Sequence, residues 1–178
     1  MGASFVGNGS LASHIASTAI FATSARCSGR FAGMMFAVHH VGICVSDLDR
    51  SLRFWCDGLG FKTTMVPAVG GEWADALEIG GDVRFTAHFI KKDGFEFELL
   101  HYQQPGVHGA PSASRNQLGF THLALYVDDL DAAIAHLVAC GGSVIQSTRT
   151  RIGEGKHSVE LVFIADPDGV RVELMKAG

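Results

Sequence analysis

The sequence predicts an α+β fold made of two tandem βαβββ modules. The main observation is an internal repeat: the motif HVGICVSDLD, which starts at His40, returns as HLALYVDDLD from His122. A second motif, FELL at residues 97–100, returns as VELM at residues 172–175. Repetition on this scale indicates two copies of one supersecondary unit. A unit this small rarely buries a sufficient core alone, so we expect the copies to pack together.

The composition is typical of a globular protein with a small-molecule partner. Hydrophobic residues make up 47% of the chain and charged residues 18%, which favours a packed core over disorder. The net charge is −4 and the pI is about 6.1, so no basic field exists to bind nucleic acid or an anionic membrane. No window approaches the 18 apolar residues of a membrane span. We therefore expect neither a nucleic-acid nor a membrane partner.

Residues 1–35 differ from the rest of the chain. They are rich in serine, contain no acidic residue, and carry only Arg26 and Arg30 for charge. This composition fits an organellar transit peptide, and it fits equally a tag or a misassigned leader. We therefore place the folded domain at residues 36–176. We expect a cytoplasmic protein, or an organellar one if the segment is a transit peptide.

The four cysteines contain no Cys-x-x-Cys pair. Cys44 lies in a predicted strand and Cys56 in a predicted helix. We interpret them as reduced, buried thiols, because disulfide frameworks belong mostly to shorter secreted chains.

The first module is predicted at residues 36–104. A strand at 36–45 precedes a helix that Asp47 can cap. The apolar face of this helix recurs at helical spacing through Leu48, Leu52, Trp55 and Leu59. Three further strands are expected at 61–66, 83–91 and 94–102, with the turn Lys92-Asp93-Gly94 before the last.

The second module is predicted at residues 117–176, after a linker at 105–116 that lacks periodicity. It repeats the same order: a strand at 119–127, a helix capped by Asp128 or Asp129, and strands at 143–148, 159–165 and 169–176. The apolar face of the helix consists of Leu130, Ile134, Leu137 and Val138. The turn at 166–169 contains Asp-Pro-Asp-Gly.

Strand parity predicts which side chains line the concave face of a curved mixed sheet. Side chains two positions apart share a face, and one parity is apolar in all four relevant strands. This parity should pack on outer helices, which leaves the other to line a cavity. His39 has the apolar parity, so we interpret it as a core or rim residue. The four candidates of the cavity parity are His40, Glu98, His122 and Glu173.

Two imidazoles and two carboxylates at equivalent places in two modules favour a divalent metal site. This donor set suits Ni²⁺, Zn²⁺, Co²⁺, Fe²⁺ or Mn²⁺, and it leaves one or two positions for water or substrate. We therefore predict one such ion per site, with all four side chains converging on one cavity. Four further residues share the cavity parity and are candidates for substrate binding: Phe120, Tyr126, Arg171 and Met175.

The repeated modules and the motifs HHVGICVSDLDRSLRFW, FELLHY, GFTHLALYVDDLDAA and DPDGVRVELM resemble the vicinal oxygen chelate superfamily, which includes glyoxalases, bleomycin resistance proteins and extradiol dioxygenases. The resemblance covers residues 36–176. It implies that His40, Glu98, His122 and Glu173 are metal ligands, a set similar to that of bacterial glyoxalase I. The sequence departs from the glyoxalase I pattern at two positions. Cys44 and Tyr102 stand where glyoxalase I has an Arg and an Asn that hold glutathione.

We interpret the protein as a metal-dependent lyase or isomerase that removes a proton next to a carbonyl and forms an enolate. The resemblance implies that a ligand carboxylate doubles as the base, and we choose Glu173, with Glu98 as the alternative. Two other classes stay open: a metal-free antibiotic-binding resistance protein and, less favoured, a ring-cleaving dioxygenase. The resemblance also implies a homodimer, although a site within one chain is an alternative.

Overall fold

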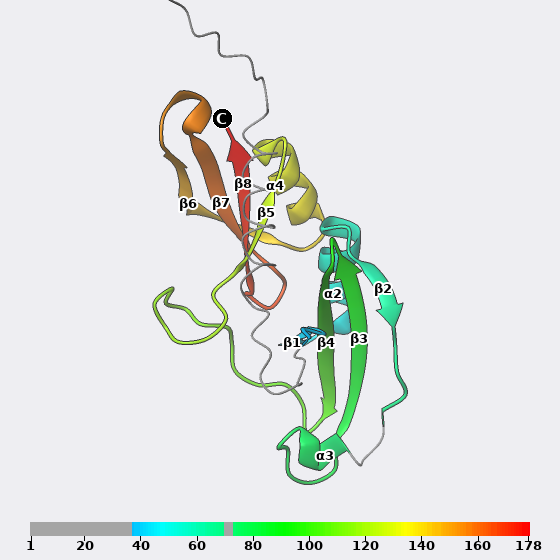
Figure 1. Ribbon diagram of the computed structural model, residues 1–178. Helices are drawn as coiled ribbons and strands as arrows, with labels where there is room; N and C mark the ends of the chain where they lie inside the picture. The colour runs from blue at the N-terminus through cyan, green and yellow to red at the C-terminus, as the bar shows by residue number, and fades with distance from the viewer. Residues whose placement is uncertain (1–36, 70–72) are drawn as a thin grey trace, which may run out of the picture.

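The structure is a computed structural model that describes residues 37–69 and 73–178 of the chain. It contains two modules with one four-stranded sheet each (Figure 1). The predicted α+β class with two βαβββ modules is therefore confirmed. The predicted leader at residues 1–35, Cys27 and the start of the first strand at residue 36 lie outside the described residues.

In the first module the sheet order is β1-β4-β3-β2, with β1 parallel to β4 and the other neighbours antiparallel. A π-helical segment, η1, continues helix α2 directly. In chain order the elements are β1 (Val41–Cys44), α2 (Leu48–Leu52), η1 (Arg53–Gly58), β2 (Lys62–Met65), α3 (Trp73–Ala76), β3 (Arg84–Lys92) and β4 (Phe95–Gln104).

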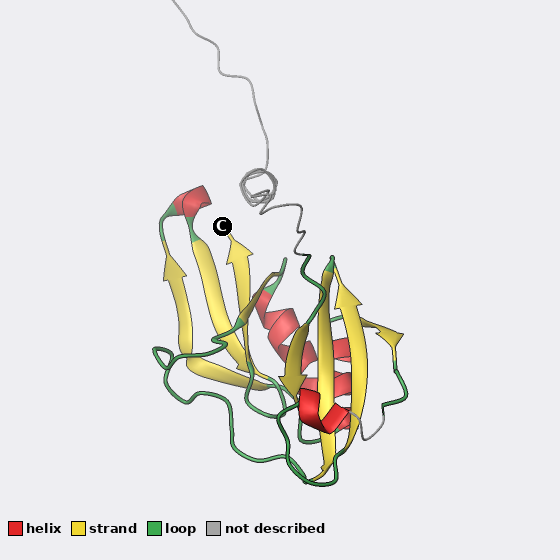
Figure 2. Cartoon of the chain, turned by 60° about the horizontal axis from the view of Figure 1, so that its bottom comes forward, coloured by secondary structure: helices red, strands yellow, loops and turns green. Residues whose placement is uncertain are grey.

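The second module repeats this arrangement with the order β5-β8-β7-β6, and β5 is parallel to β8. Its single longer helix is regular, without a π-helical segment. In chain order the elements are β5 (Leu123–Tyr126), α4 (Leu130–Ala139), β6 (Ser143–Ile152), η2 (Gly155–His157), β7 (Val159–Ala165) and β8 (Arg171–Ala177). Figure 2 shows the helix α4 and the helix formed by α2 and η1 near the centre of the molecule, whereas η2 lies at the far end of β6 and β7.

Capping and turn residues fix the element ends as the sequence predicts. The Asp47 carboxylate accepts a hydrogen bond from the Arg50 backbone N–H at 3.0 Å, and Asp129 accepts one from the Ala132 N–H at the same distance. These bonds satisfy N–H groups that a helix start leaves without a partner. The turn before β4 needs left-handed backbone, which Asp93 and Gly94 supply with φ values of +50° and +86°.

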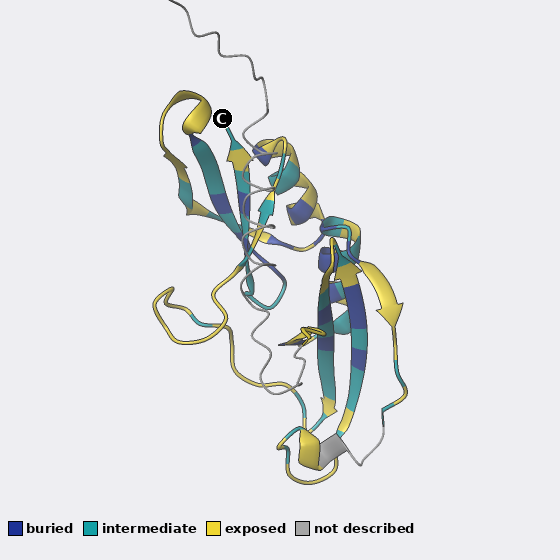
Figure 3. Cartoon of the chain, viewed as in Figure 1, coloured by how far each residue is buried: buried dark blue, intermediate teal, exposed yellow. Residues whose placement is uncertain are grey.

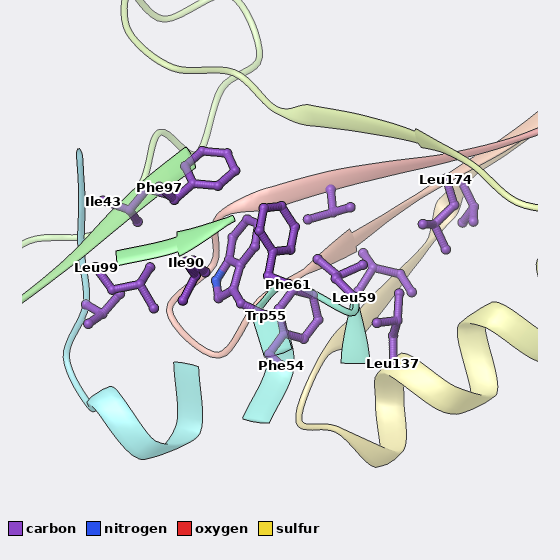
Figure 4. Close-up of a cluster of buried hydrophobic side chains, with 14 of the residues drawn as sticks. Ile43, Phe54, Trp55, Leu59, Phe61, Ile90, Phe97, Leu99, Leu137 and Leu174 are labelled. Atoms are coloured by element: carbon purple, nitrogen blue, oxygen red, sulfur yellow. The ribbon is translucent and has the colours of Figure 1, made fainter. Parts of the chain in front are cut away.

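One hydrophobic core joins the two modules. Trp55 and Phe54 from η1 are fully buried, and Leu137 from α4 and Leu174 from β8 belong to the same cluster (Figure 4). Buried positions run along the central strands of both sheets, whereas much of the chain between the modules is exposed (Figure 3). This sharing of a core is what the small size of each repeat predicts.

Polar contacts also join the modules. The Trp55 indole N–H donates to the Asp166 carboxylate at 3.2 Å. The Ser46 backbone N–H donates to Asp168 at 2.8 Å, and the Arg53 guanidinium donates to the Ala139 carbonyl at 2.7 Å. The turn between β7 and β8, predicted only as a hairpin turn, therefore also holds the first module in place.

Several local predictions are wrong. Val138 is 46% exposed, because the buried stripe of α4 runs through Leu130 and Leu137 instead. Cys44 is exposed and not buried, because it lies on the face of β1 opposite to that of the buried Ile43. His39, predicted in the core or at its rim, is exposed, which excludes only the core alternative. The two short helices α3 and η2 lie in segments for which the sequence predicted no element.

None of the helices in the described ranges is long and apolar enough to cross a membrane.

Candidate functional site

The first module brings His40 and Glu98 together. His40 lies directly before β1, and Gly42 of β1 is opposite Glu98 on the parallel strand β4. Side chains two apart share a face, so His40 lies on the same face as Glu98. The distance from His40 Nε2 to Glu98 Oε2 is 3.1 Å.

The second module repeats the arrangement with His122 and Glu173. His122 lies directly before β5, and Ala124 is opposite Glu173 on the parallel strand β8. The distance from His122 Nε2 to Glu173 Oε2 is 3.2 Å. The same strand register therefore produces the same pair twice.

Each histidine has two supporting neighbours that the sequence reasoning missed. Phe89 is opposite Glu98 on β3, and its ring packs edge-on against His40 at 5.1 Å between centroids. Phe163 is opposite Glu173 on β7 and packs edge-on against His122 at 5.3 Å. An aromatic residue opposite each glutamate was a usable signal, because antiparallel partners share a face.

The residue before each histidine contacts its second ring nitrogen. Thr121 Oγ1 lies 3.1 Å from His122 Nδ1, and His39 Nδ1 lies 2.7 Å from His40 Nδ1. A partner on the second nitrogen fixes the ring orientation and the tautomer of a metal-binding histidine. His39, which we expected in the core or at its rim, therefore sits beside His40.

The four predicted ligands do not converge within one chain. In the described part of the chain, no group of three or more His, Cys, Asp or Glu side chains is placed to hold a metal ion. The sequence left open whether the two halves of the site meet within one chain or across a dimer, and the described residues of one copy do not bring the four side chains into one cavity. What one chain provides is two separate His–Glu pairs.

The geometry of each pair fits two neighbouring ligands of one ion. With metal–ligand distances of about 2.1 Å, adjacent ligand atoms lie about 3.0 Å apart in octahedral and about 3.4 Å apart in tetrahedral coordination. The observed separations of 3.1 and 3.2 Å fall in this range. A pair alone leaves the remaining ligands to be supplied from elsewhere.

The four predicted substrate-binding residues divide between different places. Phe120 and Arg171 line a pocket of about 310 Å³ between β1 and the start of β8. Tyr126 lines a second pocket, of about 170 Å³, with residues of α4 and the end of η1. Met175 is half-buried opposite Tyr126 in the β5–β8 pairing and lines neither pocket.

Cys44 and Tyr102 lie near Glu98, in the positions where the resemblance predicted glutathione-holding residues. Cys44 is exposed, but partial desolvation by its neighbours raises the pKa of its thiol, and the Asp168 carboxylate raises it further. Burial likewise raises the pKa of Tyr102, with smaller effects from Cys44 and Glu98. Both groups are therefore neutral at neutral pH, and neither offers a positive charge to a carboxylate.

Comparison with known proteins agrees with this architecture. Residues 37–174 match the family model described as Glyoxalase/Bleomycin resistance protein/Dioxygenase superfamily. The chain belongs to this superfamily. A probable lactoylglutathione lyase of Synechocystis is 29% identical over 144 residues, which cover 80% of this chain and 95% of that protein. A 2-epi-5-epi-valiolone epimerase of Actinomyces is 30% identical over 151 residues, with 78% of each chain covered.

A solved structure shows the same fold. The glyoxalase family protein from Bacillus cereus superimposes with a TM-score of 0.67 at 20% identity, covering 81% of this chain and 95% of the other. Membership of the glyoxalase/bleomycin resistance protein/dioxygenase superfamily confirms the resemblance to vicinal oxygen chelate proteins. It also accounts for the two βαβββ modules.

Proposed function

We propose that the chain is a divalent-metal-dependent, glyoxalase-like lyase or isomerase that acts on a small carbonyl substrate. The observation that carries this proposal is the pair of equivalent His–Glu contacts, at 3.1 and 3.2 Å, in equivalent register. The names of the relatives, a lyase and an epimerase, support the same reaction class. In this proposal the ligands are His40, Glu98, His122 and Glu173.

We place the complete site between two copies of the chain. One pair supplies two protein ligands, and a first-row divalent ion in a catalytic site takes three or four. The pair from the first module of one copy, joined to the pair from the second module of another, supplies four. Strands β1 and β5 are both edge strands, so each has an open side on which a second copy can pack.

When bound, the divalent ion would supply positive charge beside the substrate carbonyl oxygen, which makes an adjacent proton easier to remove. Glu173 is the proposed base: it takes that proton at the carbon next to the carbonyl and returns it to the same or the neighbouring carbon. Its side chain is only 14% exposed, so little bulk water competes for the proton. Glu98 is the alternative base.

Glutathione is not the proposed cosubstrate. The side chains of Cys44 and Tyr102 cannot replace the bidentate grip of a guanidinium on a carboxylate. We therefore expect weak or absent turnover of the adduct of methylglyoxal and glutathione, measured by thioester formation. A kcat/KM in the usual enzyme range of about 10⁴ to 10⁸ M⁻¹s⁻¹ would contradict this expectation.

Metal analysis of purified protein tests the proposal. We expect one divalent ion per chain, and His122→Ala should lose it while the far-UV spectrum stays unchanged. His157→Ala in the exposed helix η2 is the matched control and should keep the ion. A full metal content in the double variant His40→Ala/His122→Ala would refute the ligand assignment. A metal-free wild type that still binds a ligand would favour a metal-free binding protein.

A further inference from the structure

The larger pocket contains two arginines and no acidic side chain. The strand β1, residues 111–121 and the start of β8 surround it. Arg115 comes from the segment between the modules, and Arg171 from the first position of β8. None of the described residues that line this pocket is Asp or Glu. The pocket therefore concentrates positive charge without an internal counterion.

The hydrogen bonds of the two arginines leave most of their donors available. Arg115 donates to the backbone carbonyls of Ser112 and Thr121, the latter at 3.3 Å. Arg171 donates to the Gly169 carbonyl at 2.9 Å. Among the described residues, neither guanidinium lies within ion-pair distance of a carboxylate. A guanidinium has five N–H donors, so both can still bind another acceptor.

The two positive charges also affect each other. Arg115 and Arg171 line the same pocket, so their positive charges lie near each other. Two cations in one partly buried pocket repel each other, and an anion between them would remove this repulsion. The backbone carbonyls that hold Arg115 keep its guanidinium in place for such an anion.

The pocket lies next to the pair His122–Glu173, because residues adjacent to this pair in the chain line it. Arg171 lies two positions before Glu173 on the same face of β8, which is about 6.6 Å along a strand. Thr121 lines the pocket and contacts His122 Nδ1 at 3.1 Å. Phe120 also lines the pocket and is 52% exposed, so its ring can pack against the body of a small molecule.

We propose that Arg115 and Arg171 bind the anionic end of the substrate, a carboxylate or a phosphate monoester, while its carbonyl end lies at His122 and Glu173. This inference rests on the proposed function for the position of the carbonyl end. The substrate class is then an anionic carbonyl compound of a few carbon atoms, because the two subsites are only two strand positions apart. Bidentate binding by guanidinium suits both kinds of oxyanion.

Three small ketones with the same hydroxyketone group test the inference. Hydroxypyruvate carries a carboxylate, dihydroxyacetone phosphate carries a phosphate, and dihydroxyacetone is neutral. We expect calorimetry on the full-length, metal-loaded protein in a phosphate-free buffer to show at least tenfold tighter binding of one or both anions than of the neutral compound. The anion that binds more tightly identifies the group that the pocket prefers.

Substitution of the arginines completes the test. Arg171→Gln should weaken binding of the anionic ketone at least tenfold and leave binding of dihydroxyacetone unchanged. Arg115→Gln should act in the same direction, and Arg171→Lys should recover part of the loss. Arg151→Gln, an exposed arginine on β6, is the matched control and should change nothing. Near-UV circular dichroism checks that each variant is folded.

Two results would overturn the inference: equal binding of all three ketones, or unchanged anion binding in Arg115→Gln/Arg171→Gln. The metal content of the same samples separates failure of this inference from failure of the proposed function. Arginine variants that keep their metal but lose anion binding support both proposals. If the protein never holds metal but its anion binding depends on the two arginines, the anion pocket is supported. The proposed function is then refuted, and with it the placement of the carbonyl end at His122 and Glu173.

Discussion

The two modules hold equivalent His–Glu pairs in different surroundings. The core of the first module is largely aromatic, with Phe54, Trp55, Phe61 and Phe97 in contact. The core of the second is aliphatic, with fully buried Val162, Ile164, Val172 and Leu174. The helices differ too, since only the first module continues its helix into a π-helical segment. Nevertheless the Nε2–Oε2 distances differ by only 0.1 Å, from 3.1 to 3.2 Å.

This difference shows that strand register, and not core composition, sets the candidate site. In both modules the histidine stands two positions before the residue that faces the glutamate across a parallel strand pair. Backbone hydrogen bonds maintain this register whatever the side chains beneath the sheet. The core can therefore vary between modules, provided that it keeps the sheet in place.

The largest expected effect concerns the aromatic core. Trp55→Ala should lower the free energy of unfolding by about 3–5 kcal/mol, because it removes a fully buried ring. It also removes the indole N–H that binds Asp166 of the other module. Trp55→Phe keeps most of the volume and should cost less. Urea unfolding measures both, and a loss below about 1 kcal/mol for Trp55→Ala would contradict the shared core.

The next effect concerns the point where the second module approaches the first. A Cβ on Gly142 would lie 2.7 Å from Phe54 Cε2 and 3.0 Å from the Leu137 carbonyl oxygen. We expect Gly142→Ala to cost about 1–3 kcal/mol by overpacking. Gly80→Ala is the matched control, because a Cβ there meets nothing within 4 Å. Equal stabilities of the two variants in urea unfolding would show that the modules are not tightly packed at this point.

A smaller effect distinguishes the supports of the two histidines. Thr121→Val removes the hydroxyl beside His122 Nδ1 while keeping the shape of the side chain. We expect metal affinity to fall about 10- to 100-fold, the usual effect of losing a hydrogen-bond partner of a ligand. Thr150→Val on the exposed part of β6 is the control. Unchanged affinity in a competition titration with a chromogenic chelator would mean that Thr121 does not orient the ring.

The smallest expected effect is on the pH dependence of stability, to which Asp166 and Glu96 contribute in opposite directions. Burial raises the pKa of Asp166, while the hydrogen bonds that it accepts act against this. The folded state therefore holds this proton more tightly, and the stability of wild type relative to Asp166→Asn should fall as pH rises above 3.8, the ordinary value.

Glu96 in the first module has the opposite shift. The Thr64 hydroxyl lowers its pKa, and the charge of Lys91 also lowers it. Its contribution to stability is present above 4.5, the ordinary value, and is lost as pH falls through the lowered pKa. The stability of wild type relative to Glu96→Gln should therefore rise with pH. Urea unfolding from about pH 3 to about pH 7 measures the stability difference between wild type and each variant. If this difference changes with pH in the same direction for Asp166→Asn and Glu96→Gln, the two predictions are contradicted.

The sequence predicted what depends on local periodicity. The helix starts at Asp47 and Asp129 and the parity of His40 and Glu98 follow from spacing alone, because strand faces alternate and helix caps are local. The placement of one module against the other depends on contacts such as Trp55–Asp166 and Ser46–Asp168. The two aspartates lie in the turn before β8, which has no periodic signal that points to the other module. For this reason the sequence could identify four candidate ligands but could not show that one chain keeps them in two separate pairs.

Mixed dimers test the central claim most directly. One chain carries His40→Ala/Glu98→Ala, the other carries His122→Ala/Glu173→Ala, and different affinity tags isolate the co-expressed heterodimer. If each site joins the first module of one copy to the second module of another, each variant alone binds no metal, and the heterodimer regains one intact site. We therefore predict one divalent ion per heterodimer, compared with two per wild-type dimer. A heterodimer without metal, alongside a wild type that holds it, would contradict the shared site.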